Sequence, residues 1–207
     1  ALVALDLDLN SSTNAIWARS VISAMASGNI QVDFLSRTTR PGEFELSVQS
    51  FCNNVIDATS FSEEGAHDDY GITPRFRARQ VIALAKSEGY DFVLTQGIEL
   101  SRYVAGGKAL QSSLWAICDD SPFDVSKFTP QELKHLEVIA RGAKLVLTGS
   151  PSVRGMLEST IPSVTSKTRL LPSFKLELND IPKPSGNEHV IFYDSGLGYS
   201  ALSTLDF

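Results

Sequence analysis

Length, charge and cysteine content narrow the class of this 207-residue chain before any motif is considered. Its 43% hydrophobic and 20% charged residues are typical of a globular protein long enough to fold around its own core. A formal net charge of −6 argues against nucleic acid as a partner. Two cysteines form neither a disulfide framework nor a metal-ligand spacing, which indicates a reducing, cytoplasmic environment. We expect no metal and no cofactor. No apolar run reaches the roughly 18 residues of a transmembrane segment, and peripheral contact with a membrane stays open.

The opening residues predict the unit around which the fold is organised. Residues 2–9 are typical of a strand, and the polar residues 10–14 of a loop. Apolar residues then recur from Ala18 to Met25 at the spacing of one helix face. A strand, a polar loop and an amphipathic helix form the first unit of a doubly wound α/β sheet. Ligands of such sheets lie at the carboxyl ends of the strands, so we expect function around this loop.

Further strands alternate with helices along the chain. The patterns predict strands at residues 30–35, 54–58, 91–96, 113–118, 144–149 and 169–171. Between them they predict a short helix after Phe44 and helices over residues 74–88, 97–105 and 130–142 and after Pro151. The acidic residues 62–70 are expected to form a mobile surface loop, and Arg75, Arg77 and Arg79 to line the solvated face of a helix.

These patterns predict one mainly parallel, Rossmann-like α/β sheet with helices on both faces. Residues 1–182 are expected to form this domain. A polar stretch with several prolines follows Pro172 and is typical of a linker. Residues 183–207 are therefore expected to contain a linker and the start of a truncated carboxyl-terminal domain.

Four segments in the second half resemble GT-B glycosyltransferases, of the retaining, family-4-like kind. Gly89-Tyr90-Asp91-Phe92-Val93-Leu94-Thr95-Gln96-Gly97 is similar to a strand of that family, and Ile117-Cys118-Asp119-Asp120 to its "hhHD" strand end. Residues 140–150 and 167–173 resemble its next two motifs. Two departures occur: residues 10–14 replace the family's glycine pair, and Asp119 replaces its usual histidine.

The resemblance implies the amino-terminal, acceptor-side domain of a nucleotide-sugar-dependent hexosyltransferase. Its partners would be a nucleotide-sugar donor and a glycan, lipid-linked or small-molecule acceptor. The donor domain is missing from this chain, so the full-length protein is expected to be an enzyme and the isolated chain to be inactive.

Polar residues after the predicted strands are the candidates for the site. Asp119 is the candidate catalytic residue because of its position in the motif. The candidate substrate-binding residues are Ser11, Ser12, Thr13, Asn14, Gln96, Asp120, Gly149 and Ser150. Backbone N–H groups at helix starts bind phosphate oxygens, although cap and turn chemistry alone would account for several of these residues.

Two other functions stay open. Asp6 and Asp8 resemble the D-x-D strand end of haloacid-dehalogenase-like phosphatases, and Thr95, Lys108 and Asp119 follow in the order that this chemistry requires. The spacing of Thr95 and Asp119, however, leaves no room for an intervening strand and helix. The altered first loop would also fit a non-catalytic domain that binds a glycan or a partner protein.

Overall fold

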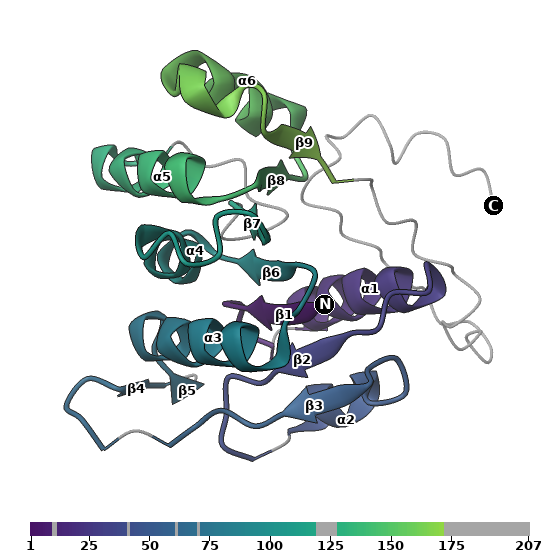
Figure 1. The fold of residues 1–207 in the computed structure, drawn as a ribbon. Coiled ribbons are helices and arrows are strands. Elements are labelled where there is room, and N and C mark those ends of the chain that lie inside the picture. The colour runs from purple at the N-terminus through teal and green to yellow at the C-terminus, as the bar shows by residue number, and fades with distance from the viewer. Residues whose placement is uncertain (10–11, 41, 61, 70, 119–127, 172–207) are drawn as a thin grey trace, which may run out of the picture.

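The computed structural model describes residues 1–9, 12–40, 42–60, 62–69, 71–118 and 128–171. These residues form a seven-stranded sheet in the order β3-β2-β1-β6-β7-β8-β9 (Figure 1). Every neighbouring pair in this sheet is parallel, so the predicted architecture is confirmed. The strands are β1 (Leu2–Leu5), β2 (Asp33–Leu35), β3 (Asn54–Ile56), β6 (Val93–Gln96), β7 (Leu114–Ile117), β8 (Leu145–Thr148) and β9 (Thr168–Leu170).

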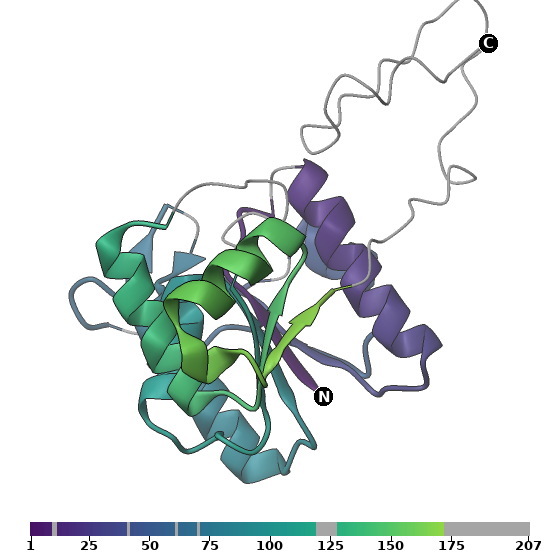
Figure 2. The same ribbon diagram turned by 90° about the horizontal axis from the view of Figure 1, so that it is seen from above.

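Helices cover both faces of the sheet (Figure 2). One face packs against α1 (Ser12–Ser27) and α2 (Glu43–Val48). The other packs against α3 (Pro74–Glu88), α4 (Ile98–Gly106), α5 (Pro130–Gly142) and α6 (Pro151–Thr160), which a short 3₁₀ turn, η1 (Pro162–Val164), follows. Side chains alternate along β1 and so contribute to the cores on both faces of the sheet. Val3 and Leu5 pack on the side of α1 and α2, and Leu2 and Ala4 on the side of α3 to α6. All four side chains are fully buried.

The strand order reverses between β1 and β6. From β1 the chain adds β2 and β3 on one side, and after α3 it crosses over to add β6, β7, β8 and β9 on the other. In doubly wound sheets the carboxyl ends of the strands at this reversal form the usual ligand site. Because all strands of the sheet are parallel, the residues after β1, β6 and β8 lie at one edge of it.

Local capping signals predicted the helix starts well. In α5 the Thr129 hydroxyl accepts a hydrogen bond from Glu132 N at 3.2 Å, and the Glu132 carboxylate accepts one from Thr129 N at 2.5 Å. In α6 the Ser150 hydroxyl accepts from Val153 N at 3.3 Å, and Pro151 is the first helical residue.

Four local predictions were wrong. β1 ends at Leu5 rather than at residue 9, and α1 begins at Ser12, inside the predicted loop. Part of the predicted acidic loop forms β4 (His67–Asp68), which pairs antiparallel with β5 (Gly71–Ile72). Arg77 was expected at a solvated helix face, but its side chain is fully buried.

The predicted linker and second domain lie outside the described residues. None of the helices in the described part of the chain is both long enough and apolar enough to cross a membrane.

The approach of α4 and α5 provides a test of the packing. A Cβ atom at Gly142 would lie 2.3 Å from the carbonyl oxygen of Ala105, a backbone atom that cannot move aside. We expect Gly142→Ala to lower the free energy of unfolding by about 1–3 kcal/mol in urea denaturation. Gly155 in α6 has nothing within 4 Å of such a Cβ, so Gly155→Ala should stabilise the protein by about 0.5–1 kcal/mol. Equal effects of the two substitutions would contradict the view that the Ala105 backbone leaves no room for a side chain at Gly142.

Candidate functional site

The loop after β1 is fastened to the start of α1. The side-chain amide of Asn14 donates to the carbonyl oxygen of Asp8 at 3.2 Å. Ser12, Thr13 and Asn14 form the first turn of α1, where backbone N–H groups have no partner within the helix. The start of α1 therefore lies at the edge of the sheet where the sequence placed a phosphate-binding loop.

Gln96, a candidate binding residue, braces the end of β1. Its side chain is fully buried, and its Oε1 accepts a hydrogen bond from Asp6 N at 2.9 Å. The same N–H lies 3.1 Å from the backbone carbonyl of Gln96. Gly97 follows with φ +95°, and a Cβ there would lie 2.8 Å from the Asp6 Cβ. Glycine is needed here because the backbones at the ends of β1 and β6 come so close.

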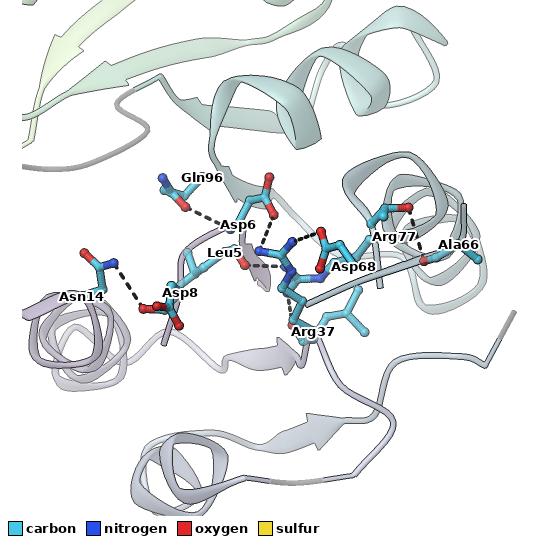
Figure 3. Close-up of polar contacts among 11 residues, drawn as sticks. Leu5, Asp6, Asp8, Asn14, Arg37, Ala66, Asp68, Arg77 and Gln96 are labelled. Atoms are coloured by element: carbon cyan, nitrogen blue, oxygen red, sulfur yellow. Dashed lines mark hydrogen bonds and ion pairs between the residues drawn. The ribbon is translucent and has the colours of Figure 1, made fainter. Parts of the chain in front are cut away.

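A chain of charges extends from Asp6 across the end of β2 (Figure 3). Arg37 Nη1 lies 3.2 Å from Asp6 Oδ1, and Arg37 Nη2 lies 2.6 Å from Asp68 Oδ2. The side chains of Asp6 and Arg37 are 11% and 10% exposed. Burial raises the pKa of the Asp6 carboxyl, while the positive charges of Arg37 and then Arg77 act against that rise. Arg37 therefore holds a largely desolvated carboxylate at the reversal point and ties it to β4.

Arg77 reaches this edge from α3. Its guanidinium donates to the backbone carbonyls of Leu5 and Leu35, the last residues of β1 and β2. Burial lowers the pKa of Arg77 to about 10, which leaves the group charged at physiological pH. A positive charge is thus fixed behind Asp6.

The loop after β8 has the predicted cap. Thr148 is fully buried, and its hydroxyl accepts a hydrogen bond from Ser150 N at 3.2 Å. Gly149 is exposed and Ser150 half-buried, so both reach the surface at the carboxyl edge. Ser150 is the N-cap of α6, and a role for it or Gly149 in ligand binding stays a prediction.

Ser11, Asp119 and Asp120 lie outside the described residues, as do the side chains of Ser12 and Thr13. The described loop starts after β1, β6 and β8 lie at one edge of the sheet, and convergence of Ser11, Asp119 and Ser150 in one site stays a prediction.

Sequence reasoning missed Arg37 and Asp68. A signal for Arg37 was present, since it stands two residues after the predicted strand 30–35 and hence at the carboxyl edge. Its two carboxylate partners are 31 residues away in each direction along the chain, and no local pattern reports such a pairing. For the phosphatase hypothesis, Asp6 would have to act as a nucleophile while its Oδ1 is held by Arg37.

A parallel sheet wound on both faces, with polar residues at its carboxyl edge, defines a Rossmann-like α/β protein. Among solved structures, a sucrose-phosphate synthase from Thermosynechococcus elongatus matches with a TM-score of 0.53 and 16% identity, over 83% of this chain and 87% of that one. Another structure of that synthase has a TM-score of 0.54 and 17% identity, over 83% of this chain and 47% of that one. A glycosyltransferase from Rickettsia africae matches with a TM-score of 0.54 and 12% identity, over 82% of this chain and 41% of that one.

These likenesses show that the chain has the Rossmann-like α/β fold of the parts of those proteins that it matches. The chain spans less than half the length of the second synthase structure and of the glycosyltransferase. A scan against protein-family models and a search of curated proteins found no match.

The charge chain at the edge predicts a pH-dependent loss of stability. Arg37→Ala should lower the free energy of unfolding by about 3–5 kcal/mol at neutral pH, because it leaves Asp6 desolvated without its nearest cation. The folded-state pKa of Asp6 then lies further above the unfolded value. The cost should therefore be larger at about pH 8 than at about pH 5, where protonation relieves it. Urea denaturation at both pH values measures this.

The control is Arg79→Ala. Arg79 pairs with Glu63 at 3.1 Å, and both side chains are about half exposed. Its removal should change the free energy of unfolding by less than about 1 kcal/mol at either pH. A pH-independent cost for Arg37→Ala would mean that lost packing, and not the stranded carboxylate, accounts for it.

Proposed function

We propose that this chain is the acceptor-binding, amino-terminal domain of a glycosyltransferase that uses a nucleotide-sugar donor. The observation that carries the proposal is the fold match to a sucrose-phosphate synthase and a glycosyltransferase over more than four fifths of the chain. In addition, three of the glycosyltransferase-like motifs fall at the carboxyl ends of β6, β7 and β8, where this fold places its ligands.

The proposed roles follow from the chemistry of the edge. The starts of α1 and α6 direct N–H groups toward this edge and suit phosphate oxygens, with Ser12 to Asn14 on one side and Gly149 and Ser150 on the other. Ser11 is proposed to bind with the first group. Asp119 would accept a hydrogen bond from a hydroxyl group near the reacting atoms, with Asp120 beside it. Gln96 would act through the position that it gives to the end of β1.

A second domain would supply the donor half of the cleft. A transferase must hold both reactants in near-attack geometry, which is worth roughly 7–11 kcal/mol of the barrier. The chain aligns with only 47% and 41% of the two longer structures that it matches, which leaves room for such a domain in a protein of that design.

The first test uses the 207-residue chain alone. Incubation with nucleotide sugars and candidate acceptors should release no nucleotide above the blank, because the proposal assigns donor binding to a second domain. Coupled detection of the released nucleotide measures this. Steady turnover by the isolated chain would refute the division of labour proposed here.

The same preparation tests the phosphatase hypothesis. Magnesium-dependent hydrolysis of p-nitrophenyl phosphate that is lost in Asp6→Asn would favour that function over sugar transfer. We expect no such hydrolysis, since Arg37 already holds the Asp6 carboxylate.

The second test concerns Asp119 in the protein joined to its donor domain. Asp119→Ala should lower kcat/KM by about 10²-fold or more if this carboxylate contacts the reacting groups, while leaving the thermal transition unchanged. The control is Cys52→Ala. Cys52 precedes β3 at the opposite edge of the sheet, and burial, followed by the charge of Asp33, raises the pKa of its thiol to about 11. That neutral thiol should be dispensable, and equal losses from the two variants would indicate a stability effect.

A further inference from the structure

A cavity of about 470 Å³ lies between α1 and α2, beside the carboxyl ends of β1 and β2. It is within the size range of small-molecule sites. Part of its wall is apolar, from Leu7, Leu9, Ala15, Ile16 and Phe44. Ile16 is 48% exposed although it is a large aliphatic residue, so this wall continues to the surface. None of these residues was a candidate for the site from sequence.

The wall formed by α2 is held firmly in place. Glu45 is buried, and its carboxylate accepts hydrogen bonds from the Ser36 hydroxyl at 2.7 Å and from Gly42 N at 3.1 Å. Phe44 packs edge-to-face on Phe34, with ring centroids 5.6 Å apart. This wall of the cavity is therefore in place before any ligand arrives, which lowers the cost of binding.

The charges that line the cavity are balanced. Three arginines and three carboxylates are among the lining residues, namely Arg19, Arg37, Arg40, Asp8, Glu43 and Glu45. Arg37 already holds Asp6 and Asp68, and Glu45 caps α2. Counted over the whole lining, the formal charges cancel. A phosphate or carboxylate group would therefore meet as much repulsion as attraction.

A neutral sugar matches this lining better than an anion. Each sugar hydroxyl can donate one hydrogen bond and accept others, so it can use guanidinium donors and carboxylate acceptors together. The C–H face of a sugar ring would lie against the apolar wall at Ile16 and Phe44. We propose that this cavity binds a neutral sugar unit of the acceptor. This assignment rests on the proposed function and specifies the acceptor class.

The test titrates the ¹⁵N-labelled 207-residue chain with glucose, galactose, mannose, maltose and sucrose, and in parallel with inorganic phosphate. At least one sugar should shift the amide signals of cavity residues such as Arg19 and Glu43 in a saturable way. Because phosphate bound at the start of α1 would also affect Arg19, the phosphate titration is evaluated at Glu43 of α2, whose signal should not move. If no sugar shifts the cavity signals at tens of millimolar, or if phosphate shifts the Glu43 signal at lower concentration than any sugar, the proposal is overturned.

Variants at the exposed rim locate the binding. Arg19→Ala and Glu43→Ala should each weaken sugar binding by about three- to tenfold, the loss of one hydrogen bond, without a change in thermal stability. Leu46→Ala is the matched control, since Leu46 is a 64% exposed residue of α2 that does not line the cavity. Equal weakening by all three variants would place the sugar elsewhere.

The outcome is separable from that of the proposed function. The chain could bind sugar at the cavity and yet transfer no sugar when it is joined to its donor domain. That result would support the cavity site and refute the transferase. Transfer with an acceptor KM that Arg19→Ala does not change would refute the cavity and leave the transferase standing.

Discussion

The candidate site depends on one buried cation. Arg77 is completely removed from solvent, yet its guanidinium donates to the terminal carbonyls of β1 and β2. Burying a charge without partners is prohibitive, so these two carbonyls, with the negative charges of Asp6 and Glu45 nearby, are what make the burial possible. The hydrogen bonds from Arg77 occupy the carbonyl oxygens of Leu5 and Leu35, and β1 and β2 end at these two residues. α3 thereby fixes where the two loops of the site begin.

The other polar contacts of the edge build on those two strand ends. Asp6 is the first residue beyond β1, and Arg37 is the second beyond β2. Arg37 joins them across the 3.2 Å ion pair and adds β4 through Asp68. The backbone carbonyl of Arg37 also accepts from Ile72 N at 2.9 Å, so the β4–β5 hairpin is attached to this residue through both side chain and main chain. A Cβ at Gly71 would lie 2.3 Å from that carbonyl, so the contact requires glycine.

Local chemistry predicted most of the fold, and long-range chemistry accounts for the errors. The Thr129 capping box, the Ser150-Pro151 start and the apolar runs of β6, β7 and β8 are all visible within a few residues. The alternation of residues 2–9 could not show that Arg77, 72 residues after Leu5, takes the carbonyl at which the strand stops. Arg77 itself looked like one of three arginines on a helix face, because the sequence does not show where the carbonyls lie. At the site, the sequence pattern placed Gln96, Gly149 and Ser150 at the carboxyl edge of the sheet, where the structure also has them. The pairing of Arg37 with Asp6 and Asp68 has no local signature.

The position of β1 also determines the order in which the protein can assemble during synthesis. β1 is made before the other strands of this sheet but lies in its middle, between β2 and β6. Its β2 partner is complete by Leu35, whereas its partner on the other side is complete only at Gln96. Until then the fully apolar Leu2–Leu5 is an open edge on a growing chain, and unpaired apolar edges recruit other strands. While roughly 60 further residues are synthesised, from Leu35 to Gln96, one edge of β1 on the nascent chain stays unpaired. A chaperone that covers this edge would be most useful during that interval.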